Sequence, residues 1–150
     1  MKISLYNSLT REIEDFAPLE DNLVRIYSCG PTVYNYPHIG NMRAFLFADL
    51  LQRTMRVVGK YDVRWVMNIT DIDDKTIRDS AIGSPNWRKE MGEQTNSPYE
   101  NLKKFTKFYE QAFLEDIEKL GINTQHFYAM PHATDYIPQM QELIRKIYQN

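Results

Sequence analysis

Residues 27–43 read Tyr-Ser-Cys-Gly-Pro-Thr-Val-Tyr-Asn-Tyr-Pro-His-Ile-Gly-Asn-Met-Arg, and this stretch decides the fold of the chain. It combines a strand exit, a loop stiffened by two prolines, and a His-x-Gly-Asn turn that opens a helix. A helix N-terminus leaves about four backbone N–H groups unpaired and carries roughly half a positive charge, so it attracts phosphate. Gly40 has no Cβ and lets a phosphate or a flat base approach the backbone. His38 and Asn41 can direct donors at charge that grows on a phosphoryl group, so we expect a nucleotide-triphosphate site.

The flanking residues predict a strand, a helix and a second strand. Residues 23–28 are rich in β-branched and aromatic side chains, and residues 61–69 alternate in polarity with Trp65 on the core side. Residues 41–58 form a helix whose wide apolar surface predicts burial on most sides. A right-handed βαβ crossover with parallel strands follows, which makes the chain an α/β protein with a Rossmann-like sheet.

The helix over 41–58 also has a polar side, formed by Asp49, Gln52, Arg53 and Arg56. With Lys60, the two arginines could contact RNA, but a solvated helix face is the favoured interpretation.

A second strand-to-helix turn follows at residues 70–75, Thr-Asp-Ile-Asp-Asp-Lys. In parallel sheets ligands bind at the carboxyl ends of strands, so the two turns should form a cleft. The acids Asp71, Asp73 and Asp74 have two open interpretations, as caps of the next helix or as groups that contact substrate or magnesium.

The second half of the chain is expected to be mainly helical. Residues 83–97 are polar and contain glycine, which predicts a loop, and Ser97-Pro98-Tyr99-Glu100 predicts a capping box at the start of a helix that ends at Gly121. A short strand over 126–130 and a helix from Thr134 follow. We expect one unit at 1–96 and a helical segment at 97–150 that ends abruptly, as a fragment would.

Composition sets further limits. The 150 residues are 43% hydrophobic, enough for an ordinary core, and the net charge of −2 gives no overall attraction for nucleic acid. The single cysteine, Cys29, excludes an internal disulfide and suits a reducing compartment. Without a signal peptide or an apolar run long enough to cross a bilayer, we expect a soluble, cytoplasmic protein.

Two segments together resemble the cysteinyl-tRNA synthetases, which are class I aminoacyl-tRNA synthetases. They are Cys29-Gly-Pro-Thr-Val-Tyr-Asn-Tyr-Pro-His-Ile-Gly-Asn41 and Asn68-Ile-Thr-Asp-Ile-Asp-Asp-Lys75, and the likeness covers most of the chain. The His-Ile-Gly-Asn tetrad is a variant of the class I HIGH motif, with Asn41 as a mild departure. The resemblance implies the first half of a Rossmann-like catalytic domain and the start of a connective insertion.

The resemblance also implies an activity. Cysteine and ATP would give cysteinyl-adenylate and pyrophosphate, with Mg²⁺ expected beside the ATP, and the cysteinyl group would then pass to tRNA(Cys). His38 and Asn41 would be catalytic, and the protein is expected to be monomeric. By the same likeness, ATP would contact Thr32, His38, Gly40 and Asn41, and cysteine would contact Cys29, Gly30 and Thr70.

Zinc is the expected metal, with Cys29 as one ligand. A zinc ion in the amino-acid pocket would bind the substrate thiolate and reject serine, which an apolar pocket does poorly. Zinc needs about four ligands, and neither His126 nor His132 matches a family position. The other ligands, the Lys-Met-Ser-Lys-Ser type motif and the tRNA-binding part would lie beyond residue 150, so the fragment alone is expected to be inactive.

Two alternatives stay open. A cysteine ligase that joins the activated amino acid to a small amine, as in thiol-cofactor synthesis, would share both segments. A truncated, non-catalytic paralogue that binds a nucleotide or a partner would share them as well.

Overall fold

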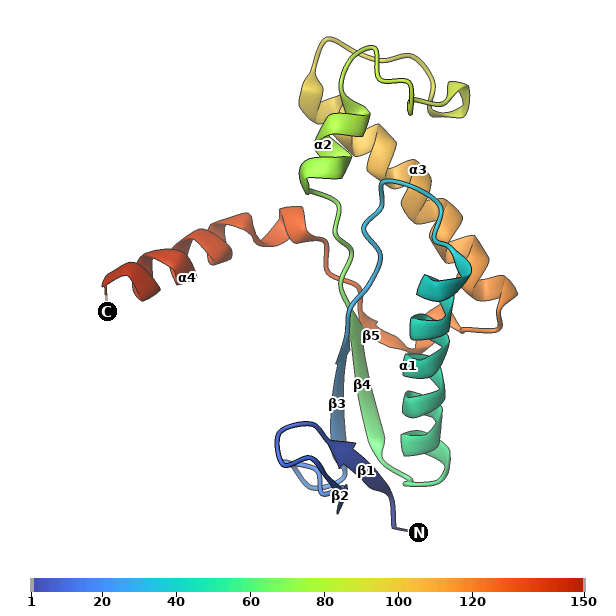
Figure 1. Cartoon of the computed structure of the whole chain (residues 1–150), viewed down its shortest axis with the longest axis vertical. Coiled ribbons are helices and arrows are strands. Elements are labelled where there is room, and N and C mark those ends of the chain that lie inside the picture. Colours follow the sequence, from blue (N-terminus) through green and yellow to red (C-terminus); the bar gives the residue numbers. More distant parts are fainter. Residues whose placement is uncertain (1, 150) are drawn as a thin grey trace.

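The computed structural model describes residues 2–149, which form a parallel sheet with helices and a small separate hairpin (Figure 1). The strands are β1 (Ser4–Asn7), β2 (Glu12–Asp15), β3 (Leu23–Ser28), β4 (Asp62–Met67) and β5 (Phe127–Ala129). The α-helices are α1 (Ile39–Val57), α2 (Asp74–Ser80), α3 (Pro98–Lys119) and α4 (Ile137–Gln149). Three short 3-10 helices, η1 (Lys89–Met91), η2 (Thr124–His126) and η3 (Ala133–Tyr136), lie in the connections.

The sheet has the order β3-β4-β5, and both strand pairs are parallel. β3 and β4 are in register from Leu23 opposite Asp62 to Ser28 opposite Met67, and α1 is the crossover between them. The α/β, Rossmann-like fold class predicted from the sequence is therefore confirmed. The short strand expected over 126–130 is β5 at the third position.

The hairpin of β1 and β2 was not predicted from the sequence. Ser4 pairs with Asp15 and Asn7 with Glu12, and the tight turn between the strands places Arg11 at φ 62°. A hydrogen bond from the backbone N–H of Phe16 to the carbonyl of Ile3 (2.8 Å) extends the pairing of β1 with β2. The hairpin packs beside the lower end of β3, where Ile3, Leu5 and Phe16 adjoin the small cluster of Val24, Met55 and Val63.

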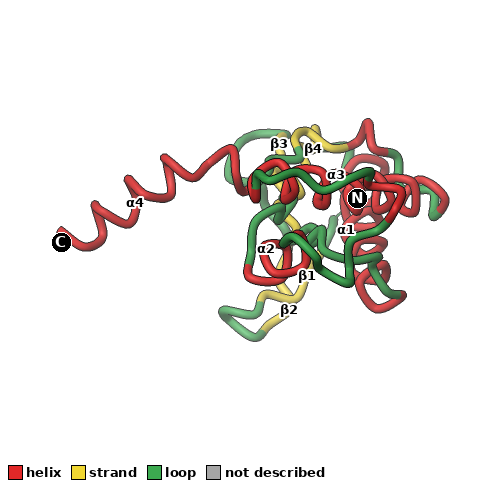
Figure 2. Tube along the Cα trace, turned by 90° about the horizontal axis from the view of Figure 1, so that it is seen from above, coloured by secondary structure: helices red, strands yellow, loops and turns green. Residues whose placement is uncertain are grey.

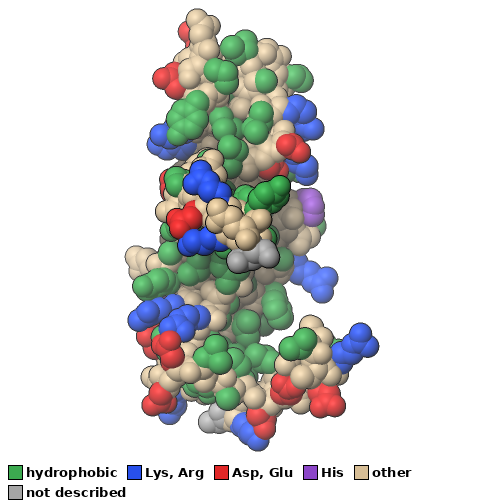
Figure 3. Space-filling model, turned by 90° about the vertical axis from the view of Figure 1, so that its left-hand side faces the viewer, with side chains coloured by type: hydrophobic (Ala, Val, Ile, Leu, Met, Phe, Trp, Pro, Cys, Tyr) green, Lys and Arg blue, Asp and Glu red, His purple; other side chains and the backbone are tan. Residues whose placement is uncertain are grey.

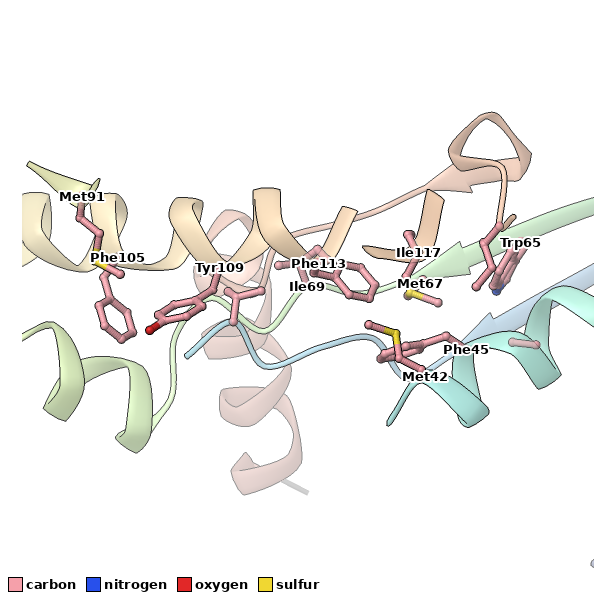
Figure 4. Close-up of a cluster of buried hydrophobic side chains, with 13 residues drawn as sticks. Met42, Phe45, Trp65, Met67, Ile69, Met91, Phe105, Tyr109, Phe113 and Ile117 are labelled. Carbon is pink, nitrogen blue, oxygen red and sulfur yellow. The ribbon is translucent and has the colours of Figure 1, made fainter. Parts of the chain in front are cut away.

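One hydrophobic core joins α1, the sheet and α3 (Figure 4). Trp65 is fully buried, as predicted from the alternation of its strand. The face of α3 that meets it is also buried; its members are Phe105, Tyr109, Phe113 and Ile117. This core crosses residue 96, so α3 is packed on the same sheet as the preceding residues, and the division at residue 96 stays a prediction.

The prediction that α1 is buried on most sides is wrong for the described residues. Phe47 and Leu50 are exposed on its outer side, whereas Asp49 and Gln52, expected on a solvated polar face, are buried. The apolar pattern alone could not identify the buried side, because hydrogen bonds and an ion pair stabilise polar side chains that turn inward.

These polar side chains tie α1 to the rest of the fold. Gln52 Nε2 donates to Asp49 Oδ1 (3.0 Å) and lies 3.2 Å from His126 Nδ1. Asp49 also pairs with Arg53, whose Nη2 donates to the carbonyl of Gly121. We call these three residues, Asp49, Gln52 and Arg53, the polar seam of α1. Arg53 was considered above as part of a surface for RNA, but these bonds give it a structural role.

Arg56 extends the seam to the sheet, because its Nη2 donates to the carbonyl of Val63 (2.7 Å) and to that of His126 (3.4 Å). One side chain thus joins α1 to β4 and to the residue that precedes β5.

The predicted helix start at Ser97 is confirmed, with the Ser97 side chain accepting from the backbone N–H of Glu100 (3.4 Å) and Pro98 as the first residue of α3. The predicted capping box is only half formed, because the Ser97 N–H donates to Thr95 Oγ1 (3.2 Å) and not to the Glu100 side chain. Gly121, at φ 81°, follows the helix as expected of a glycine stop. The expected loop over 83–97 is present and contains only η1.

α4 extends away from the remainder of the molecule (Figure 2), and the side chains that it presents include hydrophobic and charged ones (Figure 3). Its connection to the body is held by backbone hydrogen bonds with Ile69 and by side-chain contacts. Asp71 accepts hydrogen bonds from the backbone N–H (3.0 Å) and hydroxyl of Thr134, and His132 Nε2 lies 2.9 Å from Glu110 Oε1 on α3.

Within residues 2–149, no helix is both long and apolar enough to traverse a lipid bilayer.

The core predicts a large effect of truncation at α3. Phe113→Ala should lower the free energy of unfolding by about 3–5 kcal/mol, because the ring is almost fully buried against Phe45 at a centroid distance of 5.1 Å. Leu50→Ala on α1 is the matched control, since Leu50 is 63% exposed and should change stability by less than about 0.5 kcal/mol. Urea unfolding measures both, and equal losses would contradict the assignment of the core.

The His132–Glu110 contact predicts a pH dependence of stability. Burial lowers the pKa of His132, but the hydrogen bond with Glu110 and the charges of Glu110, Asp71 and Asp135 outweigh it, so this pKa is raised above 6.5. The contact therefore stabilises the fold fully below the unfolded pKa, and that contribution is lost as pH rises through the higher folded value.

Glu110→Gln should weaken this dependence, so its unfolding free energy should differ from that of the parent chain more at about pH 6 than at about pH 8. Glu115→Gln on the exposed side of α3 is the control. A Glu110→Gln effect that is independent of pH would show that the contact does not involve a charged imidazole.

Candidate active site

The pairing of β3 with β4 is interrupted directly after both strands, and this break positions Cys29 and Gly30. Asn68 fills the break: its Oδ1 accepts from the backbone N–H of Gly30 (3.0 Å) and from the Tyr27 hydroxyl (3.1 Å). Gly30 passes so close to Asn68 that a Cβ there would lie 1.7 Å from the Asn68 carbonyl oxygen. Only glycine fits this crossing, which is a structural reason for Gly30 in addition to the contact with cysteine expected from the resemblance.

Cys29 is exposed, and its Sγ lies 3.6 Å from the carbonyl oxygen of Gly30. The common role of an unpaired cysteine, a small buried hydrophobe, is therefore excluded. The thiol is at the carboxyl end of β3, where the sequence predicted it.

The two chain segments pair again at Thr32 and Thr70. These residues form a parallel bridge, with hydrogen bonds from Val33 N to Thr70 O (3.1 Å) and from Thr70 N to Pro31 O (2.9 Å). Asn68 Nδ2 donates to Thr70 Oγ1 (3.0 Å), which fixes the threonine hydroxyl. The two strand-to-helix turns therefore run side by side, as predicted, with Thr32 and Thr70 directly opposite each other.

His38 is the N-cap of α1. Its Nδ1 accepts from the backbone N–H groups of Gly40 (3.1 Å) and Asn41 (3.4 Å), and Asn41 Oδ1 accepts from the His38 backbone N–H (3.2 Å). The pair thus forms a reciprocal capping box in which histidine takes the place usually occupied by serine or threonine. This cap was not foreseen, because imidazole is not among the common N-cap side chains.

The cap changes which groups are available to a ligand. Because Nδ1 is an acceptor, the neutral imidazole carries its proton on Nε2, so that Nε2–H is a donor. The Asn41 amide likewise uses its oxygen in the cap and keeps its Nδ2 donors. The N–H groups of Gly40 and Asn41, expected to be free for a phosphate, are instead bonded to the ring, and the exposed turn offers side-chain donors in their place.

Gly40 lies against the imidazole ring that caps its helix. A Cβ at this position would lie 3.0–3.1 Å from the imidazole of His38, which is tighter than ordinary contact. The glycine therefore leaves space for the capping ring, in addition to any space it leaves for a nucleotide.

The three aspartates after β4 divide between two roles. Asp73 caps α2 by accepting from the Thr76 backbone N–H (2.8 Å), and Asp71 caps the start of η3 through Thr134. The helix-cap interpretation holds for Asp73, whereas Asp71 bonds to Thr134 in η3 and does not cap the next helix. Asp74 is exposed in the first turn of α2, where a carboxylate suits the positive end of the helix.

Cys29 is the one metal ligand that the sequence predicted in this chain. The exposed thiol of Cys29 suits zinc, but residues 2–149 contain no group of three His, Cys, Asp or Glu side chains arranged to hold an ion. His126 and His132 are engaged with Gln52 and Glu110. The described residues do not form a zinc site by themselves.

Asn68 is the site residue that sequence reasoning did not single out. It was noted only as part of the second family-like segment, yet its side chain contacts Tyr27, Gly30 and Thr70. The available signal was an amide placed at the end of an apolar strand, where a side chain can replace missing backbone pairing.

Comparison with known proteins identifies the family. Residues 15–150 match the family model of the tRNA synthetases class I (C) catalytic domain. A cysteine–tRNA ligase from Brachyspira hyodysenteriae is 46% identical over 148 residues, or 99% of this chain and 27% of that protein. Those of Leptospira interrogans and Methanosarcina mazei are 43% and 45% identical, over 98% and 97% of this chain.

The chain spans about a quarter of the length of these curated relatives, 27% of each. The family match covers the whole Rossmann-like sheet with both strand-to-helix turns, and it agrees with the resemblance seen in the two sequence segments. On these grounds, the chain belongs to the family of class I (C) tRNA synthetase catalytic domains.

Proposed function

We propose that the protein containing this chain is a cysteine–tRNA ligase, which activates cysteine with ATP and transfers it to tRNA(Cys). The observation that carries this proposal is the His38–Asn41 cap, which presents two side-chain donors beside the paired turns at Thr32 and Thr70. The curated relatives support the choice of amino acid, because those compared are named cysteine–tRNA ligases. They do not favour a small-amine ligase or a non-catalytic paralogue.

The first step is displacement at the α-phosphate of ATP. A carboxylate oxygen of cysteine attacks phosphorus, the bond to the bridging oxygen breaks, and pyrophosphate leaves with the electron pair. His38 Nε2–H and the Asn41 amide stabilise the negative charge on the phosphoryl oxygens. These donors are held by the cap before substrate arrives, so little reorganisation is needed at the moment of reaction.

The nucleotide lies along the turn, with Thr32 beside it and Gly40 leaving room for its base. Mg²⁺ accompanies ATP and balances charge on its phosphates. In the second step the terminal ribose hydroxyl of tRNA(Cys) attacks the carbonyl of the adenylate, and AMP leaves.

Cysteine binds at the break between the strands, where Cys29, Gly30 and Thr70 lie on connected backbone segments. Cys29 would be one ligand of a zinc ion, whose other ligands would come from outside the described residues. A bound zinc would supply preference for a thiolate over a hydroxyl. We further propose that the protein acts as a monomer in the cytoplasm.

The function is tested with the protein expressed from its complete reading frame. Cysteine-dependent exchange between ATP and pyrophosphate is expected, and His38→Ala should reduce its kcat about 100-fold or more, with a smaller effect on the KM for ATP. A raised KM for ATP with an unchanged kcat would show that His38 binds the ground state and the transition state equally.

His38→Asn is the matched control, because asparagine is a good N-cap but has no imidazole N–H. His38→Ala should lose about 1 kcal/mol of stability and His38→Asn should regain most of it, while the kcat of both stays reduced. Recovery of exchange with His38→Asn would show that the histidine serves only as a cap.

The role of Cys29 is tested in the same protein with Cys29→Ser. Because the thiol is exposed and makes only one weak contact, the free energy of unfolding of the metal-free protein should be unchanged. Zinc affinity should fall more than about tenfold, since a thiolate ligand is lost, and discrimination of cysteine from serine should fall with it. Undiminished zinc binding in a competition titration with a chelator would exclude Cys29 as a ligand.

A further inference from the structure

A hollow of about 550 Å³ lies on the side of the loop that faces α2 and α3, separate from the His38 cap. Tyr34 from the loop, Arg78 from α2, Tyr109 from α3 and the segment that includes Trp87, Arg88 and Lys89 form its walls. In Figure 1 this segment, residues 81–97, lies beside α2 and the first half of α3. A hollow of this volume is within the usual range of small-ligand sites.

The wall formed by the irregular segment is held in place by side-chain hydrogen bonds. Trp87 Nε1 donates to the carbonyl of Gly92 (2.8 Å), which closes one turn of the segment. Gln94 joins its two ends, since its Nε2 donates to Ala81 O (2.9 Å) and its Oε1 accepts from Gly83 N (2.8 Å). The hollow is therefore formed without a ligand.

Aromatic rings and cations both line this hollow, and Tyr36 and Lys75, which lie outside its lining, contact two of the lining residues. Arg88 donates from Nε to the Tyr109 hydroxyl (3.1 Å) and lies over the ring of Tyr36 at 5.3 Å. Lys75 lies over the ring of Tyr34 at 4.6 Å. Planar rings beside cations suit a ligand with a flat base and a phosphate.

Two acidic residues, Asp79 and Glu90, line the hollow, and the charge of Asp79 is already neutralised. Asp79 is buried and accepts two hydrogen bonds from Arg78, at 2.6 and 2.9 Å, and this contact lowers its pKa despite its burial. Lys89 is exposed and makes no ion pair with any residue from 2 to 149, so its charge is available to an anion.

A second hollow of about 410 Å³ adjoins the first and shares Trp87 and Lys89 with it. Gly92, Glu93 and Gln94 complete its lining. Trp87 is thus a wall of two neighbouring spaces, and Lys89 lies between them. This arrangement matches two consecutive nucleotides, with a base in each space and the phosphate that joins them near Lys89.

We propose that these two hollows bind an unpaired segment of RNA, with at least one base stacked on Trp87 and a phosphate paired with Lys89. The proposal rests on the proposed function, which makes RNA a substrate, and it identifies the face of this chain that receives an unpaired part of it. Single-stranded RNA is favoured because stacking on aromatic rings requires bases that are free of a duplex. An acidic peptide would use the cation but not the ring faces.

The two tryptophans allow a direct test with the 150-residue chain. Trp65 is 0% exposed, whereas Trp87 lines the hollows, so a stacked base should quench only Trp87. A single-stranded hexaribonucleotide of mixed sequence should therefore quench fluorescence in a saturable way. Trp87→Phe should abolish the quenching, and Trp65→Phe should retain it.

The phosphate contact is tested by anisotropy of the same oligonucleotide carrying a fluorescent label. Lys89→Gln should weaken binding several-fold and reduce the slope of log K against log salt by about 0.7, the value for one single-strand phosphate contact. Lys119→Gln, at the opposite end of α3, removes the same charge and should change neither quantity. Equal effects of the two variants would overturn the proposed contact.

Three further outcomes would overturn the proposal. They are equal quenching by AMP at the same nucleotide concentration, equal binding of a blunt RNA duplex, and binding of a poly-glutamate peptide in preference to the oligonucleotide. The two proposals fail separately, because quenching is measured without ATP or cysteine and pyrophosphate exchange is measured without RNA. Quenching without exchange in the complete protein would overturn the proposed function alone.

Discussion

The close crossing of Gly30 and Asn68 is the constraint on which the arrangement of the site depends. Two parallel strands that continued in regular pairing would carry residues 29–33 straight on along the sheet. The Asn68 side chain instead takes the place of a backbone partner for Gly30, and pairing returns at Thr32 and Thr70. The exposed thiol of Cys29 therefore lies at an interruption in the pairing, and both following turns start from a fixed position.

Some elements could be predicted from the sequence and others could not, for physical reasons. β3, β4 and the start of α3 were predicted because their signals are local: β-branched alternation in the strands and Ser97 with Pro98 at the helix start. Trp65 was placed in the core for the same reason. The hairpin of β1 and β2 was missed, because its turn has no Asn-Gly or Asp-Gly pair and places Arg11 in the left-handed region instead.

The orientation of α1 shows where local pattern fails. Its outer side has Phe47 and Leu50, while Asp49 and Gln52 are buried, because Asp49 pairs with Gln52 and Arg53 and Gln52 also contacts His126, which is distant in sequence. For the site, the turn and its residues could be predicted, whereas the use of the His38 ring as a helix cap could not. Whether a histidine caps or faces solvent depends on a few ångströms of loop geometry that two prolines and a glycine do not determine.

The bonds from Arg53 and Arg56 have a consequence for how this protein can change during evolution. Their acceptors are the main-chain carbonyls of Gly121, Val63 and His126, which every amino acid possesses. Substitutions at those three positions can therefore keep the connection as long as the backbone path is kept. Only the two arginines must keep their side chains for these bonds to form. Substitutions at the three acceptor positions therefore require no second substitution in α1.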